Sequence, residues 1–179
     1  MTQQSIIRLG LMALMASTQA FSAEPGAHVH GLAMLQVTQD QNTVSIDLDS
    51  PLGNLLGFER APDTDKQKQA VQQMIEKLRQ PEKLFALTAA AQCTAGPVQL
   101  TAPVLQLGVP EKGGAEKDGE HAGIEFAVSF HCRMPAALKD LNVNLFNAFS
   151  GLHQLDVQVV GPRGQSAAKL TPKQRRLFW

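Results

Sequence analysis

The stretch that decides the fold is HVHGLAMLQVTQDQNTVSIDLDSP, residues 28–51. Apolar and polar residues alternate along both halves, with turn-forming residues at 39–42 between them, which predicts a β-hairpin. In the second half Val44, Ile46 and Leu48 share one face and the residues between them share the other, because successive strand side chains point to opposite sides. We therefore expect a hairpin with one buried face and one exposed face.

The segment DTDKQKQAVQQMIEKLRQ, residues 63–80, predicts an amphipathic helix. Asp63 or Thr64 can cap its first turn, and Pro81 ends it. Its apolar residues recur at i, i+3, i+4 and i+7, the spacing of one buried helix face. These residues are Val71, Met74, Ile75 and Leu78.

The remaining segments predict more strands than helices. Residues 81–87 predict a short helical turn, and apolar patterns predict strands near 98–100 and over 123–134, 141–146 and 153–162. Together with the hairpin these are about six strands and one long helix, which predicts an α+β domain with a mainly antiparallel β-sheet. Residues 108–123 are rich in glycine and charge, which predicts a mobile loop.

The N-terminal residues 1–23 predict a secretory signal peptide. Arg8 precedes the apolar stretch 9–16, and small residues follow it. We expect export of the chain and a mature single domain over residues 24–179. No other apolar run is long enough to span a membrane. With 16 Lys and Arg against 16 Asp and Glu, no excess of positive charge points to nucleic acid.

The chain has two cysteines, Cys93 and Cys132. An even number in an exported protein favours one disulfide. The alternative is that Cys132, which follows His131, is a thiolate metal ligand. Because an oxidising compartment consumes thiols, we expect the disulfide.

Two of the five histidines, His28 and His30, stand two residues apart at the start of the hairpin. On one strand their side chains leave the same face. If the turn is centred on residues 39–42, Asp49 lies across from residue 32 and diagonally beside His30, and Asp47 shares its face. A different turn length would change this register.

Two imidazoles and a carboxylate supply the three protein ligands that Zn²⁺ accepts. We therefore consider His28, His30 and Asp49 or Asp47 as a metal site, with His121 or water in the fourth position. The simpler alternative is that the histidines are only the polar start of a strand. Cu²⁺ and Ni²⁺ suit the same ligands.

Several stretches together resemble the ZrgA family of periplasmic zinc-binding proteins. They are GAHVHGLAMLQV (26–37), SIDLDSPLGNLLGFERAPDTDKQ (45–67), the two cysteine contexts AQC and FHC, and VVGPRGQSAAKLTP (159–172). The resemblance implies a secreted zinc binder that works with an inner-membrane zinc uptake system of Gram-negative bacteria. It places His28 and His30 at the leading His-x-His-Gly of the family.

The chain departs from the family at two places. The loop that usually carries many histidines contains only His121, and Arg60 stands after GFE where members often have histidine. Both departures favour a single folded zinc site over high-capacity zinc buffering. We expect no enzymatic activity, because the chain has no HExxH or GxSxG motif. A metal-free interaction module of the cell envelope is the alternative function.

Overall fold

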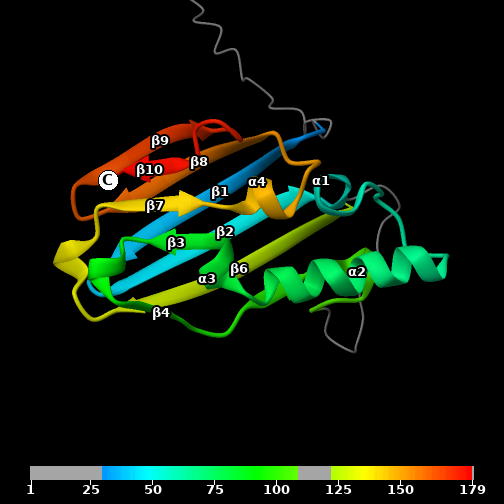
Figure 1. The fold of residues 1–179 in the computed structure, drawn as a ribbon, viewed down its shortest axis with the longest axis horizontal. Helices are drawn as coiled ribbons and strands as arrows, with labels where there is room; N and C mark the ends of the chain where they lie inside the picture. The colour runs from blue at the N-terminus through cyan, green and yellow to red at the C-terminus, as the bar shows by residue number, and fades with distance from the viewer. Residues whose placement is uncertain (1–29, 109–121, 179) are drawn as a thin grey trace, which may run out of the picture.

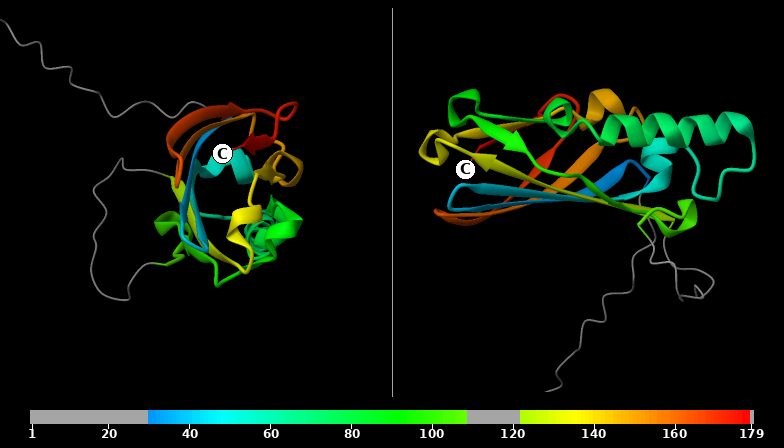
Figure 2. Two further views of the ribbon diagram at one scale, coloured as in Figure 1. Left: turned by 90° about the vertical axis from the view of Figure 1, so that its left-hand side faces the viewer. Right: turned by 90° about the horizontal axis from the view of Figure 1, so that it is seen from below.

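The computed structural model describes residues 30–108 and 122–178. The signal peptide expected at 1–23 and nearly all of the loop expected at 108–123 lie outside these ranges. The described residues confirm the α+β class with mainly antiparallel strands. They form two layers, a large curved sheet and, over one of its faces, a small sheet with the helices (Figures 1 and 2).

The large sheet has the strand order β4-β6-β2-β1-β8-β9, and β5 also pairs with β6. All of these pairs are antiparallel except β1 with β8, which are parallel. Its strands are β1 (Leu32–Asp40), β2 (Thr43–Pro51), β4 (Cys93–Ala95), β5 (Gln99–Thr101), β6 (Gly123–Cys132), β8 (Gln154–Gly161) and β9 (Gly164–Leu170).

The second layer combines a three-stranded sheet, of order β10-β7-β3, with short helices and one long helix (Figure 1). Its strands are β3 (Phe85–Leu87), β7 (Asp140–Val143) and β10 (Arg176–Phe178). The helices are α1 (Leu52–Leu56), α2 (Asp65–Leu78), α3 (Pro81–Leu84) and α4 (Leu145–Ala148). Three 3₁₀ turns complete the described elements: η1 (Ala89–Ala91), η2 (Pro103–Leu105) and η3 (Pro135–Ala137).

The hydrophobic core lies between the two layers. The apolar residues that alternate along β1, β2, β6 and β8 are buried, as predicted, because each of these strands turns one face to the second layer. Phe85 of β3 meets Phe126 of β6 with ring centroids 5.6 Å apart, so the two sheets contact each other directly. Burial of such rings is a large part of the hydrophobic stabilisation of a domain.

The hairpin forms as predicted, but its register is different. Asp40 pairs with Thr43, so the turn contains only Gln41 and Asn42, and Gln41 has a positive φ of 50°. Asp49 therefore lies across from Met34, and the expected position across from residue 32 is wrong. The predicted faces remain correct, because the register moves by an even number of residues.

Helix α2 confirms the prediction for residues 63–80. Thr64 caps it, accepting a hydrogen bond from the backbone N–H of Gln67, whose side chain bonds back to the N–H of Thr64. This reciprocal capping satisfies two of the free donors at the helix start. The four residues predicted for its apolar face are the buried ones.

Other segments differ from the expectation. Helix α1, with Gly57 at a φ of 81° as its C-cap, forms where the sequence predicted only a connection. The strand expected over 141–146 ends at Val143, and α4 follows it. Strands β3, β4, β9 and β10 were not predicted, and β3 replaces the end of the helical turn expected over 81–87. The side chains of β9 are mostly exposed and show no alternation of burial, and the other three strands are only three residues long.

The cysteines form the predicted disulfide. Cys93 of β4 and Cys132 of β6 are directly opposed in the sheet and bonded to each other. Cys132 is therefore not a thiolate metal ligand in this structure. Among the described helices, none is long and apolar enough to cross a membrane.

Candidate metal site

His30 is an exposed residue in the turn that leads into β1. The strand itself begins at Leu32, after Gly31, which has a φ of 86°. This left-handed conformation favours glycine and turns the chain away from the strand direction. The expectation that His30 lies on the strand is thus wrong, so the prediction that strand geometry points His28 and His30 to the same face does not apply. His28 lies outside the described residues.

The buried side chain of Asn54, in α1, holds this turn in place. Its Oδ1 accepts a hydrogen bond from the N–H of Gly31 at 2.7 Å, and its Nδ2 donates to the carbonyl oxygen of Leu32 at 2.8 Å. The same Nδ2 lies 3.2 Å from the hydroxyl oxygen of Ser50, another buried polar residue. One amide therefore connects the start of β1, the end of β2 and α1. A polar residue within the apolar run LGNLL was the sequence signal for this role.

Replacing Asn54 with alanine is expected to lower the free energy of unfolding by about 2–3 kcal/mol. The change leaves the N–H of Gly31 and the carbonyl of Leu32 without their partner, and each buried polar group left unpaired costs about 1–3 kcal/mol. Urea denaturation measures the difference. Asn147→Ala is the control, because Asn147 is exposed and surface changes usually stay within about 0.5 kcal/mol. Equal stability of the two variants would contradict the role given to Asn54.

His153 lies against the same turn. The backbone N–H groups of His153 and Gln154 both donate to the carbonyl oxygen of Gly31, at 2.8 and 2.9 Å. A Cβ atom placed on Gly31 would lie 2.6 Å from Cδ2 of the His153 ring, so a side chain at this position would force the ring to move. Nothing in the local sequence around His153 indicates this contact, which depends on the parallel pairing of β1 with β8.

The directions of the strands explain why histidines gather here. Strand β2 is antiparallel to both β1 and β6, and β8 is parallel to β1. Strands β1, β6 and β8 therefore start at the same end of the large sheet, which we call the starting end (Figure 1). His30 precedes β1 and His153 precedes β8. In the sequence His121 stands two residues before β6, but it lies outside the described residues.

Asp47 and Asp49 are exposed on the outer face of the sheet, as predicted. Asp47 lies between Gln36 and Ala127, and Asp49 between Met34 and Glu125. A Cβ atom placed on Gly123, the first residue of β6, would lie 3.9 Å from Oδ1 of Asp49. Asp49 is therefore close to the start of β6 and not, as expected, diagonally beside His30.

Asp156 is a further carboxylate on this face, but it already has partners. Its Oδ1 accepts hydrogen bonds from Lys169 at 3.1 Å and from Gln154 at 2.8 Å. The hydrogen bond from Lys169 is the main reason that the pKa of Asp156 lies below its usual value. Asp156 thus forms an ion pair with Lys169 that joins β8 to β9, and it is a poor candidate for a metal ligand.

His131 lies far from this site, one residue before the end of β6. Its Nε2 is 3.3 Å from Nδ2 of Asn42, which belongs to the hairpin turn. The hairpin turn and the end of β6 are at the end of the sheet opposite to the starting end. His131 is therefore separated by the length of the strand from His30 and His153.

Among residues 30–108 and 122–178, no group of three or more His, Cys, Asp or Glu side chains is arranged to hold a metal ion. The described part of the starting end supplies two exposed imidazoles, from His30 and His153. Neutral imidazole is a ligand that Zn²⁺ accepts. These residues therefore fit zinc as part of a site, and the other predicted ligands, His28 and His121, lie outside the described ranges.

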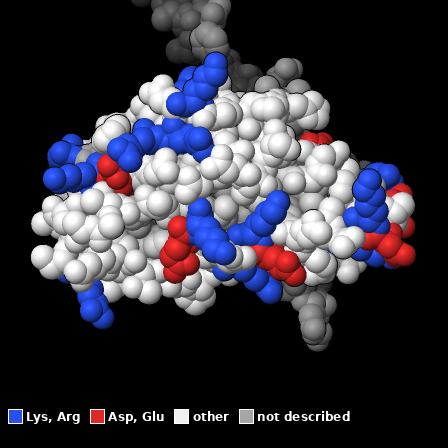
Figure 3. All heavy atoms as spheres, in the orientation of Figure 1, with Lys and Arg blue, Asp and Glu red and all other residues white. Residues whose placement is uncertain are grey.

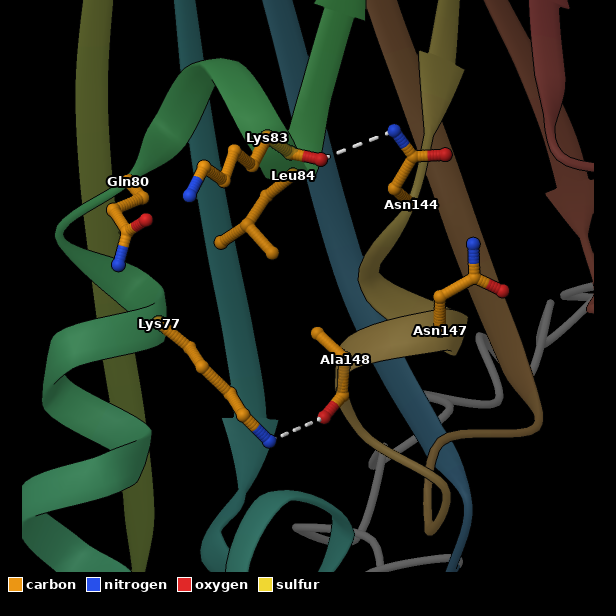
Figure 4. Close-up of a pocket in the computed structure, with 7 residues that line it drawn as sticks. All are labelled: Lys77, Gln80, Lys83, Leu84, Asn144, Asn147 and Ala148. Carbon is orange, nitrogen blue, oxygen red and sulfur yellow. Dashed lines mark hydrogen bonds between the residues drawn. The ribbon is translucent and has the colours of Figure 1, made fainter.

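A cavity of about 460 Å³ lies elsewhere, between the end of α2, α3 and α4 (Figure 4). Lysine and amide side chains line it, and Lys77 donates to the carbonyl oxygen of Ala148 at 3.0 Å. Its lining contains no histidine, cysteine or carboxylate, so its chemistry does not fit a zinc ion. On the same face of the molecule, basic and acidic side chains are interspersed (Figure 3).

The fold and the starting end define an α+β sheet domain with a cross-strand disulfide and exposed imidazoles at one end. Residues 27–179 match the family model of the ZrgA family zinc uptake proteins. The chain belongs to this family, which implies a role in zinc uptake. The search of curated proteins found no match.

Proposed function

We propose that this protein binds Zn²⁺ outside the cytoplasm and passes it to an inner-membrane zinc transporter. Membership of a zinc uptake family supports zinc as the cargo. The structural observation that carries the proposal is the exposed His30, held in a glycine turn by the buried Asn54 at the end of the sheet where three strands start. A rigid backbone places a ligand in advance, which lowers the entropic cost of binding.

The proposed ligands are His28 and His30, with Asp49 or Asp47 and His121 completing the coordination. The position of Asp49 supports this set of ligands. Its carboxylate lies next to Gly123, and Gly123 follows His121 by two residues in the sequence. Both aspartates are exposed, and Asp49 is the nearer of the two to the starting end, because it pairs with Met34 while Asp47 pairs with Gln36. Imidazole and carboxylate are both ligand types that Zn²⁺ accepts in proteins.

We also propose that residues 1–23 direct the chain to the periplasm. The disulfide between Cys93 and Cys132 supports this location, because such bonds persist in oxidising compartments. In this proposal the protein carries zinc and does not use it in catalysis, in agreement with the absence of HExxH and GxSxG motifs from the sequence.

Calorimetric titration of the metal-free protein, isolated from the envelope fraction, tests the proposal. We expect saturation at one Zn²⁺ per chain, and competition with Cu²⁺ and Ni²⁺ then ranks the metals, since Cu²⁺ binds most tightly in a simple competition. A chain that takes up no zinc would contradict the proposal and favour a metal-free interaction module. Addition of zinc to a hydrolase assay tests the absence of catalysis.

A further inference from the structure

We propose that His153 is a ligand of the same metal ion as His30. This inference rests on the proposed zinc binding and adds a ligand that comes from another strand. The two residues are far apart in the sequence, but the parallel pairing of Leu32 with Gln154 places the residues before β1 and β8 side by side.

The backbone between the two histidines is fixed at short range. The carbonyl oxygen of Gly31 accepts the N–H groups of both His153 and Gln154, and on its other side the N–H of Gly31 donates to Asn54. The His153 ring packs over Gly31, where a Cβ atom would come within 2.6 Å of Cδ2. The ring is therefore held one residue away from His30, and glycine at position 31 is what allows this approach.

Both imidazoles are available to a ligand. The side chains of His30 and His153 are exposed, and within the described ranges neither ring is hydrogen-bonded to another residue. Asp156, the described carboxylate nearest to His153 in sequence, is paired with Lys169 and so does not compete for either ring. Two imidazoles on a fixed backbone are suited to a divalent transition-metal ion, because imidazole binds zinc, copper and nickel.

Zinc titration of His153→Ala tests the inference, with His131→Ala as the matched control. We expect His153→Ala to weaken zinc binding by at least about tenfold, since even residues behind the ligands cost about 10- to 100-fold. The control removes an exposed histidine at the opposite end of the sheet and should bind zinc as the wild type does. The backbone hydrogen bonds of residue 153 do not require its side chain, so the melting temperature of His153→Ala should stay close to that of the wild type.

A second measurement uses the unchanged protein. In an NMR titration with zinc, the ring protons of His153 should shift together with those of His30, at the same metal equivalent, while those of His131 stay in place. Wild-type affinity in His153→Ala together with unmoved His153 ring signals would overturn the inference and leave the zinc proposal standing. If the wild-type protein bound no zinc at all, both proposals would fail.

Discussion

A variant in which both His28 and His30 are replaced by alanine is expected to bind zinc at least about a thousandfold more weakly than the wild type. The change removes two of the proposed ligands, and a complete structural zinc site contributes about 10–16 kcal/mol of apparent binding free energy. A thousandfold loss corresponds to about 4 kcal/mol. Calorimetry of wild type and variant under one buffer and temperature measures it directly.

Two further variants make this experiment specific. Asp49→Asn should weaken binding less than His30→Ala, because the amide oxygen remains as a poor ligand, and because Asp49 lies across from Met34 and not beside His30. His131→Ala should have no effect, since His131 contacts the hairpin turn at the other end of the sheet. Unchanged zinc affinity in the double alanine variant would show that the histidine pair is only the polar start of the domain.

Removing the disulfide, by replacing both Cys93 and Cys132 with alanine, is expected to lower the free energy of unfolding by about 4 kcal/mol. The bond joins residues 39 positions apart, and the chain-entropy model assigns about this value to a loop of that length. The loss of stability should appear first at the edge of the large sheet, because the edge strand β4 has only three residues and, among the described strands, pairs only with β6. Urea denaturation of the variant and of the oxidised wild type gives the difference.

Thiol counting under denaturing, non-reducing conditions provides the control for this prediction. The protein isolated from the envelope should show no free thiol, because both cysteines are in the disulfide. Zinc affinity of the alanine variant should match that of the wild type, since the disulfide and the starting end lie at opposite ends of β6. Two free thiols in the isolated protein would contradict the structure and make Cys132 available again as a metal ligand.

The local elements could be predicted because their signals are local. Alternation of apolar residues along residues 44–48 and 124–132 identifies the faces of β2 and β6 that are buried. The helical spacing from Val71 to Leu78, with the cap at Thr64, identifies α2. Each of these patterns lies within a few residues of chain, and the period of the pattern follows directly from helix or strand geometry.

The hairpin register is a case in which the sequence allowed two answers. Residues 39–42 are all compatible with a turn, and the structure uses only Gln41 and Asn42, with Gln41 in the left-handed region. The even shift kept Asp47 and Asp49 on the predicted face but moved Asp49 along the strand to Met34. The sequence therefore predicted the correct sheet face for the two aspartates but the wrong residue opposite Asp49.

By itself the sequence established the fold class, the apolar faces, the disulfide partners, and the family that relates the chain to zinc. It could not show that β1 pairs in parallel with β8, because that pairing joins residues from the two ends of the domain and leaves no local pattern. Only this pairing places His153 on Gly31, and only the packing of α1 on the hairpin brings Asn54 to the same turn. The arrangement of the candidate site is a property of strand order and direction, which contacts across the whole domain decide.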